Sequence, residues 1–116
     1  MYVYILKCTG GSLYTGITSD MEKRIKQHLG MIRGGAKYTR AHPVEKIAAL
    51  FETSSDTAAR KLEYAVKQLS RSVKEKIIND PWNITEVYLK DLNEYNYIPA
   101  DFKDLNRLLD DLKNNI

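Results

Sequence analysis

The first 28 residues constrain the fold of this chain more than any other stretch. Residues 2–6 (YVYIL) are a run of aromatic and branched side chains, which is typical of a β-strand. Residues 9–12 (TGGS) contain two adjacent glycines, which supply the positive backbone angles of a tight turn. Residues 13–18 (LYTGIT) then predict the returning strand, so the chain should begin with a β-hairpin.

A helix should follow this hairpin directly. Ser19 and Glu22 are three residues apart and fit a capping box, and Gly30 is a suitable stop. Arg24 and His28 lie four residues apart on this predicted helix, so their side chains should project from the same face.

A third strand and a long helix are predicted from the middle of the chain. Residues 45–52 are mostly apolar and indicate a well-covered strand, and residues 53–56 (TSSD) offer helix-capping side chains. The helix that follows should extend to about residue 78. Its apolar stripe recurs at three- and four-residue spacing: Leu62, Val66, Leu69, Val73 and Ile77, widened by Ala58, Ala59 and Ala65. The predicted class is α+β, a small antiparallel three-stranded sheet flanked by helices, with a C-terminal helical extension.

Residues 79–82 (NDPW) break the helical pattern and divide the chain into residues 1–80 and an extension, 81–116. Residues 84–89 fit a strand or a helix equally well. Residues 101–114 predict an amphipathic helix with five apolar side chains on one face: Phe102, Leu105, Leu108, Leu109 and Leu112. We expect this helix to pack on the first 80 residues, with restraint of a basic binding face as the alternative.

Charge and cysteine content narrow the class of protein. Residues 1–80 carry a net charge of +6 and residues 81–116 a net charge of −3, which favours a polyanion-binding body with an acidic appendage. The single cysteine, Cys8, excludes an internal disulfide and a cysteine-based zinc site, and we expect it to be a small strand residue. No apolar run approaches the roughly 20 residues that span a bilayer, and the start lacks the pattern of a secretion signal. We therefore expect a cytoplasmic protein.

The hairpin and its helix resemble a known signature. The tripeptides at 2–4 (YVY) and 14–16 (YTG), followed by Arg24 and His28, are similar to the motifs of the GIY-YIG endonuclease superfamily, particularly its small stand-alone bacterial members. The resemblance covers residues 1 to about 79. Tyr2 stands where the family motif names glycine, and Thr15 stands where it names isoleucine.

The resemblance implies a set of catalytic residues, Tyr4, Tyr14, Arg24, His28 and Glu63, with Glu63 as the metal ligand. From its helix position alone, Glu63 would be a solvated residue paired with Lys67. One carboxylate suffices for a single Mg²⁺ or Mn²⁺ ion, which takes its other ligands from water and phosphate. The first 80 residues show no acidic cluster for a two-metal site, so we expect one divalent ion.

The resemblance, together with the needs of phosphodiester hydrolysis, suggests roles for these residues. Arg24 suits the scissile phosphate, because its guanidinium is always charged and fork-shaped. His28 could relay a proton or only hold Tyr4 by a hydrogen bond. One of Tyr4 and Tyr14 would position or deprotonate the attacking water, and a nearby positive charge would favour its phenolate. Which tyrosine is the base stays open.

Residues 31–43 combine glycines with basic side chains and show no regular period. We predict a nucleic-acid-binding loop in which Arg33, Lys37 and Arg40 contact phosphates and the exposed ring of Tyr38 stacks on a base. An ordinary basic surface loop is the alternative.

The predicted function is metal-dependent endonuclease activity on DNA rather than RNA, possible substrates being branched or damaged DNA in repair or recombination. Two alternatives stay open. The chain could be a non-catalytic nucleic-acid-binding module, or an interaction protein that binds a partner through residues 81–116. We expect no membrane association.

Overall fold

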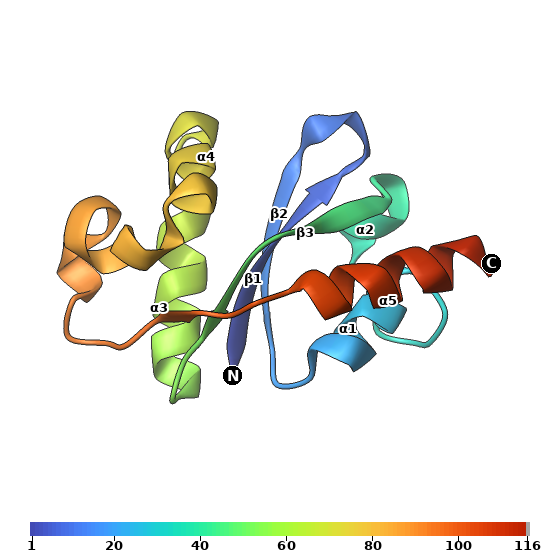
Figure 1. Cartoon of the computed structure of the whole chain (residues 1–116), viewed down its shortest axis with the longest axis horizontal. Coiled ribbons are helices and arrows are strands. Elements are labelled where there is room, and N and C mark those ends of the chain that lie inside the picture. Colours follow the sequence, from blue (N-terminus) through green and yellow to red (C-terminus); the bar gives the residue numbers. More distant parts are fainter. Residues whose placement is uncertain (116) are drawn as a thin grey trace.

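The computed structural model describes residues 1–115, which form an antiparallel sheet between two layers of helices (Figure 1). The strand order is β2-β1-β3-β4. The strands are β1 (Tyr2–Cys8), β2 (Leu13–Thr18), β3 (Val44–Glu52) and β4 (Ile98–Pro99). The helices are α1 (Met21–His28), α2 (Lys37–Ala41), α3 (Asp56–Lys67), α4 (Arg71–Asn79) and α5 (Lys103–Asn114). The α+β class is confirmed, but the predicted three strands are wrong, because the two-residue β4 adds a fourth by pairing with the end of β3.

Strand β1 lies inside the sheet, and its side chains alternate between two buried cores. Val3 and Ile5 pack with α3 and α4, whereas Tyr4, Leu6 and Cys8 pack on the side of α1 and α5. All five are at most 2% exposed. Both faces of β1 are buried, so its side chains cannot move without disturbing one of the cores. The backbone position from which the Tyr4 side chain extends is therefore fixed.

The predicted hairpin is confirmed. β1 and β2 pair with Tyr4 opposite Gly16 and Leu6 opposite Tyr14. The turn contains Gly10 and Gly11 at φ angles of 84° and 83°, the left-handed values that the paired glycines predicted.

The start of α1 differs from the prediction by one residue. Asp20, not Ser19, is the N-cap, because its carboxylate accepts a hydrogen bond from the Lys23 amide at 3.1 Å. The predicted stop at Gly30 is confirmed, since the Gly30 amide bonds back to the Gln27 carbonyl at 3.0 Å.

The single long helix predicted to residue 78 is wrong. The structure divides it into α3 and α4, and α4 starts after Ser70, whose hydroxyl accepts a hydrogen bond from the Val73 amide at 3.3 Å. Ser70 therefore begins a new helix instead of continuing the old one. The apolar stripe survives the break, because Leu62, Val66 and Ile77 are all buried in one core.

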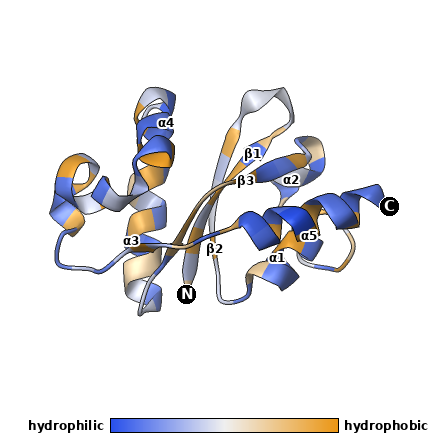
Figure 2. Ribbon diagram, viewed as in Figure 1, coloured by the Kyte–Doolittle hydropathy of each residue, from blue (hydrophilic) through white to orange (hydrophobic). Residues whose placement is uncertain are grey.

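Residues 81–115 wrap around the β3 edge and contribute to both cores. Ile84 and Tyr97 are buried on the α3 side, and Leu109 of α5 is buried on the α1 side. The undecided segment is a π-helical turn, Ile84–Tyr88. Most of the α5 ribbon is coloured hydrophilic (Figure 2), and apolar residues of α5 and its N-cap belong to the core on the α1 side: Phe102, Leu105, Leu109 and Leu112. None of the helices in residues 1–115 has the length and apolar character to cross a membrane.

Most of β3 has no strand on its outer side, because β4 pairs only with Phe51 and Glu52. Asn106 of α5 takes the place of a strand there. Its Oδ1 accepts from the Ile47 amide at 2.8 Å, and its Nδ2 donates to the Ile47 carbonyl at 3.2 Å. One side chain thus satisfies both backbone groups of an edge residue.

Replacing Asn106 with Asp should lower the free energy of unfolding by about 1–3 kcal/mol, because the Ile47 carbonyl loses its donor and faces a carboxylate instead. Denaturant unfolding would measure this. Asn96→Asp, at an exposed position outside the helices and strands, is the control and should be near neutral. Equal stability of Asn106→Asp and the parent would contradict this role.

Candidate active site

The candidate active site is built around the side chain of Tyr4, which reaches from β1 across the neighbouring strand β2. Its ring passes over Gly16, where any side chain would collide with it. A Cβ atom at Gly16 would lie only 2.6 Å from Cζ of Tyr4. The glycine of the second motif therefore provides the space in which the phenol lies.

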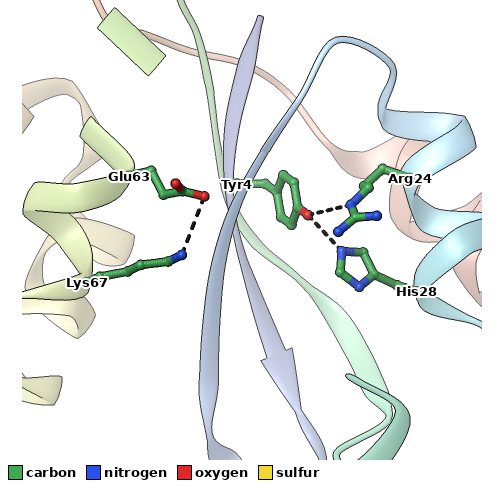
Figure 3. A network of polar contacts seen from close by, with 5 residues as sticks. All are labelled: Tyr4, Arg24, His28, Glu63 and Lys67. Atoms are coloured by element: carbon green, nitrogen blue, oxygen red, sulfur yellow. Dashed lines mark hydrogen bonds and ion pairs between the residues drawn. The ribbon is translucent and has the colours of Figure 1, made fainter. Parts of the chain in front are cut away.

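Two residues of α1 hold the Tyr4 hydroxyl. Nε of Arg24 donates to it at 3.1 Å, and Nε2 of His28 lies 2.7 Å from it (Figure 3). Arg24 and His28 project from the same face of α1, as their spacing predicted, and both reach the same oxygen.

A second hydrogen bond fixes the tautomer of His28. Its Nδ1 lies 2.8 Å from the hydroxyl of Thr39, and that hydroxyl donates to the Ala36 carbonyl at 3.1 Å. Since the Thr39 proton is committed to Ala36, the Thr39 oxygen accepts from Nδ1–H of His28. Nε2 is then the unprotonated nitrogen, and it accepts the proton of Tyr4. The result is a directional chain from Arg24 through Tyr4, His28 and Thr39 to a backbone carbonyl.

Burial keeps both ends of the central hydrogen bond neutral. It lowers the pKa of His28 to about 4, with a further lowering by the charge of Arg24. Burial also raises the pKa of Tyr4 to about 12, although the hydrogen bond and charge of Arg24 act in the opposite direction. Arg24 thus acts in the expected direction by favouring the phenolate, but burial has the larger effect and keeps the pKa of Tyr4 above its usual value.

Arg24 keeps part of its guanidinium available. Its Nη1 donates to Oε1 of Gln27 at 2.9 Å and to the Gly34 carbonyl at 2.6 Å. Its Nη2 makes no hydrogen bond within residues 1–115. A planar fork that is fixed on one side and free on the other suits an incoming phosphate oxygen.

Tyr14, the other predicted catalytic tyrosine, belongs to an aromatic row beside this chain. Its ring meets His28 edge-on at 5.3 Å between centroids and stacks with Tyr38 at 5.7 Å. Tyr38 in turn stacks with His42 at 4.4 Å. Tyr38 is half-buried, so its expected exposure is wrong, and its ring already packs against two rings of the protein.

Glu63 approaches the same edge of the sheet from the other helical layer. It extends from α3 with its side chain 24% exposed, and Oε2 lies 3.5 Å from Nζ of Lys67, the partner that the helix spacing predicted. Figure 3 shows Tyr4 between the pair Glu63 and Lys67 and the pair Arg24 and His28. The charge of Glu63 contributes to the raised pKa of Tyr4, after burial and the Tyr14 hydroxyl.

The donor set around Glu63 fits one divalent cation with few protein ligands. In the described part of the chain, no three His, Cys, Asp or Glu side chains gather into a metal-binding group. A partly exposed carboxylate with one loosely paired lysine matches the way Mg²⁺ is held, by one or two carboxylates plus water and phosphate oxygens.

The structure shows roles for helix α2 and for Gly34, both within residues 31–43, that the sequence did not predict. The region 31–43 contains the helix α2, which presents Thr39 to His28, and the backbone of Gly34 fixes Arg24. Arg33, Lys37 and Arg40 are exposed, as a phosphate-contacting surface requires. The predicted bond between His28 and Tyr4 implied that a buried histidine would need a second partner, but the sequence did not show that Thr39 is that partner.

Replacing Gly16 with Ala should displace the Tyr4 ring and break its hydrogen bonds, with a loss of about 1–3 kcal/mol of stability. In a Tyr4→Ala background the same change should cost much less, because the obstructing ring is gone. Chemical denaturation of the four proteins of this cycle measures the coupling. Equal losses in both backgrounds would show that Gly16 does not make room for Tyr4.

Comparison with known proteins agrees with the motifs that the site contains. The family model described as GIY-YIG catalytic domain matches residues 1–77. The UPF0213 protein FN1575 of Fusobacterium nucleatum is 40% identical over 91 residues, which cover 78% of this chain and 85% of that protein. The UPF0213 protein BH0048 of Halalkalibacterium halodurans is 45% identical over 78 residues, which cover 67% and 81%. The solution NMR structure of the BH0048 protein from Bacillus halodurans matches with a TM-score of 0.45 and 36% identity, covering 75% of this chain and 95% of that one. The chain belongs to the GIY-YIG catalytic domain family.

Proposed function

We propose that this protein is a metal-dependent endonuclease that hydrolyses phosphodiester bonds in DNA. The observation that carries the proposal is the Tyr4 hydroxyl, held between Arg24 and His28 at the edge of the sheet that Glu63 also approaches. Membership of the GIY-YIG catalytic domain family supports the reaction class.

We assign the role of base to Tyr4, acting together with His28. The oxygen of the attacking water forms the new bond to phosphorus, and the water proton passes to the Tyr4 oxygen. Tyr4 is fully buried in the free protein, so this step requires that substrate binding opens its hydroxyl to the attacking water. The Tyr4 proton moves at the same time along the 2.7 Å contact to Nε2 of His28. Thr39 accepts from Nδ1–H and so stabilises the imidazolium that forms. The bond from phosphorus to the leaving oxygen breaks, and that oxygen takes a proton from solvent.

A relay removes the need for a phenolate. Tyr4 with a pKa of about 12 is a poor base by itself, but it can pass on a proton as it receives one. Tyr14 has no hydrogen-bonded acceptor within residues 1–115, so we assign it to positioning the water or phosphate.

Arg24 links substrate binding to proton transfer. Its free Nη2 would hold a phosphate oxygen, and the phosphate charge would offset the charge of Arg24. Because that charge is one cause of the low pKa of His28, bound substrate makes His28 a better proton acceptor.

Glu63 would hold the divalent ion, Mg²⁺ or Mn²⁺. When bound, such an ion supplies positive charge to the phosphate oxygens and to the leaving oxygen. Arg33, Lys37 and Arg40 would contact neighbouring phosphates, and branched or damaged DNA is the proposed substrate class. We no longer assign a base-stacking role to Tyr38, since its ring supports Tyr14.

We also propose that residues 1–80 carry the catalysis and that residues 81–116 are a structural part of the same domain. The burial of Ile84, Tyr97 and Leu109 in the two cores supports this assignment.

Glu63→Gln should lower metal-dependent cleavage by at least about 10²-fold and leave the melting temperature unchanged, because the side chain lies outside both cores. Labelled flap, fork, junction, duplex and RNA substrates with Mg²⁺ or Mn²⁺ measure the activity. Glu86→Gln, at an exposed position, is the matched control. Cleavage by Glu63→Gln at the parent rate would contradict the assignment of Glu63 as the metal ligand.

The pH dependence of cleavage should reveal the protonation state of His28. The relay needs neutral His28, and a pKa of about 4 keeps it neutral above that pH. The value of kcat/KM should therefore show no step at pH 6.5, the ordinary histidine value, and should fall only as the pH decreases toward 4. An acidic step near pH 6.5 would contradict a buried, neutral acceptor.

Variants of Thr39 provide the control for this profile. Thr39→Val keeps the shape of the side chain but removes the hydroxyl that accepts from Nδ1–H of His28. The value of kcat should therefore fall about tenfold or more, with little change in KM. Thr39→Ser should restore most of the rate. Failure of Ser to do better than Val would show that Thr39 only fills space.

A further inference from the structure

A groove away from the catalytic chain lies at the turn end of the sheet, beside α4. Its volume is about 400 Å³. The floor includes Lys7 of β1 and Lys46 of β3, and α4 contributes Arg71 and Glu75. Phe102 and Asn106, at the beginning of α5, close the other side.

The two lysines in the floor are direct neighbours across the sheet. Lys7 pairs with Lys46 in the register of β1 and β3. Directly opposed residues of an antiparallel pair point to the same face, and like charges in this position are destabilising. Neither lysine forms an ion pair within residues 1–115.

The remaining charges of the groove leave it basic. Nε of Arg71 is bound to Oε1 of Glu75 at 3.0 Å, so this cation and this carboxylate largely compensate each other. The uncompensated charge is therefore that of Lys7 and Lys46. Two lysines on opposed positions of one sheet face, neither of them in an ion pair within residues 1–115, offer positive charge to an anionic group such as a phosphate.

The shape and position of the groove indicate which phosphate. A volume of about 400 Å³ lies in the range that accommodates a nucleotide-sized ligand. Apolar side chains, including Leu13 and Phe102, flank the lysines and could contact a sugar or a base. Lys7 is three residues from Tyr4 on β1, roughly 10 Å along the strand, but its side chain lies on the opposite face of the sheet, which α3 and α4 cover. A polynucleotide that contacts both would therefore pass around the β2 edge of the sheet.

We propose that this groove binds a phosphate of the nucleic-acid substrate, a few nucleotides away from the bond that is cut. The inference rests on the proposed function, since it assigns the bound polyanion to the substrate. It also gives the extension a second role, because Phe102 and Asn106 lie outside residues 1–77, which match the family.

Binding of a fluorescein-labelled 15-nucleotide single strand, measured by anisotropy in EDTA over a series of salt concentrations, tests this site without cleavage. Lys46→Glu should weaken binding about fivefold or more and reduce the salt dependence by the equivalent of one phosphate contact. Lys46→Gln should have a smaller effect in the same direction. Lys90→Glu makes the same change of charge at an exposed position outside the groove and should weaken binding less.

Thermal melting of the same variants gives an independent readout. Lys46→Glu should melt at the parent temperature or above it, because a Lys7–Glu pair replaces two like charges. Loss of affinity together with retained or raised stability supports the site. Equal weakening by Lys46→Glu and Lys90→Glu, unchanged binding by Lys46→Glu, or a lower melting temperature would each overturn it.

These outcomes separate the groove from the nuclease activity. Binding that depends on Lys46, in a protein that cuts none of the DNA or RNA substrates, would support the groove as a binding site and contradict the proposed function. Cleavage of DNA by a protein whose affinity does not depend on Lys46 would support the proposed function and contradict the groove as a binding site.

Discussion

The hydrogen bond between Tyr4 and His28 is the contact on which the arrangement of this site depends. It is buried, so both partners must be satisfied by other groups of the protein. The space for the phenol comes from Gly16 on β2, the imidazole comes from α1, and the second partner of the imidazole comes from α2. One polar chain therefore links β1, α1 and α2, and β2 provides the space for it, so a change in any of these elements would be transmitted to the Tyr4 oxygen.

The same burial determines the chemistry that the site can perform. Removing water keeps Tyr4 and His28 uncharged, which argues against a resting phenolate and favours a concerted transfer. The positive charge of Arg24 is retained beside them and would be balanced only when a phosphate arrives. Glu63 belongs to the other helical layer, so the carboxylate and the phenol approach the sheet edge from opposite sides.

The parts of this account that the sequence predicted are the local ones. A hairpin with paired glycines and a pair of helix residues at i and i+4 depend only on neighbours in the chain, so both could be predicted from the sequence alone. The helix break at Ser70 was missed because the apolar stripe continues across it. Thr39 and the stacking of Tyr38 were missed because they depend on how residues 31–43 fold back on α1, and that path has no periodicity to reveal it. The β4 strand is only two residues long and exists through its tertiary contact with β3.

The protonation of His28 is the most direct test of the account. The chain contains two histidines, so ¹⁵N NMR of the imidazole nitrogens from pH 3 to 8, with His42→Gln for assignment, can follow His28 alone. We predict the Nδ1–H tautomer at neutral pH and a pKa of about 4, with the Nε2 resonance shifting in a Tyr4→Phe variant. The Nε2–H tautomer, or a titration near the ordinary pKa of 6.5, would contradict the relay.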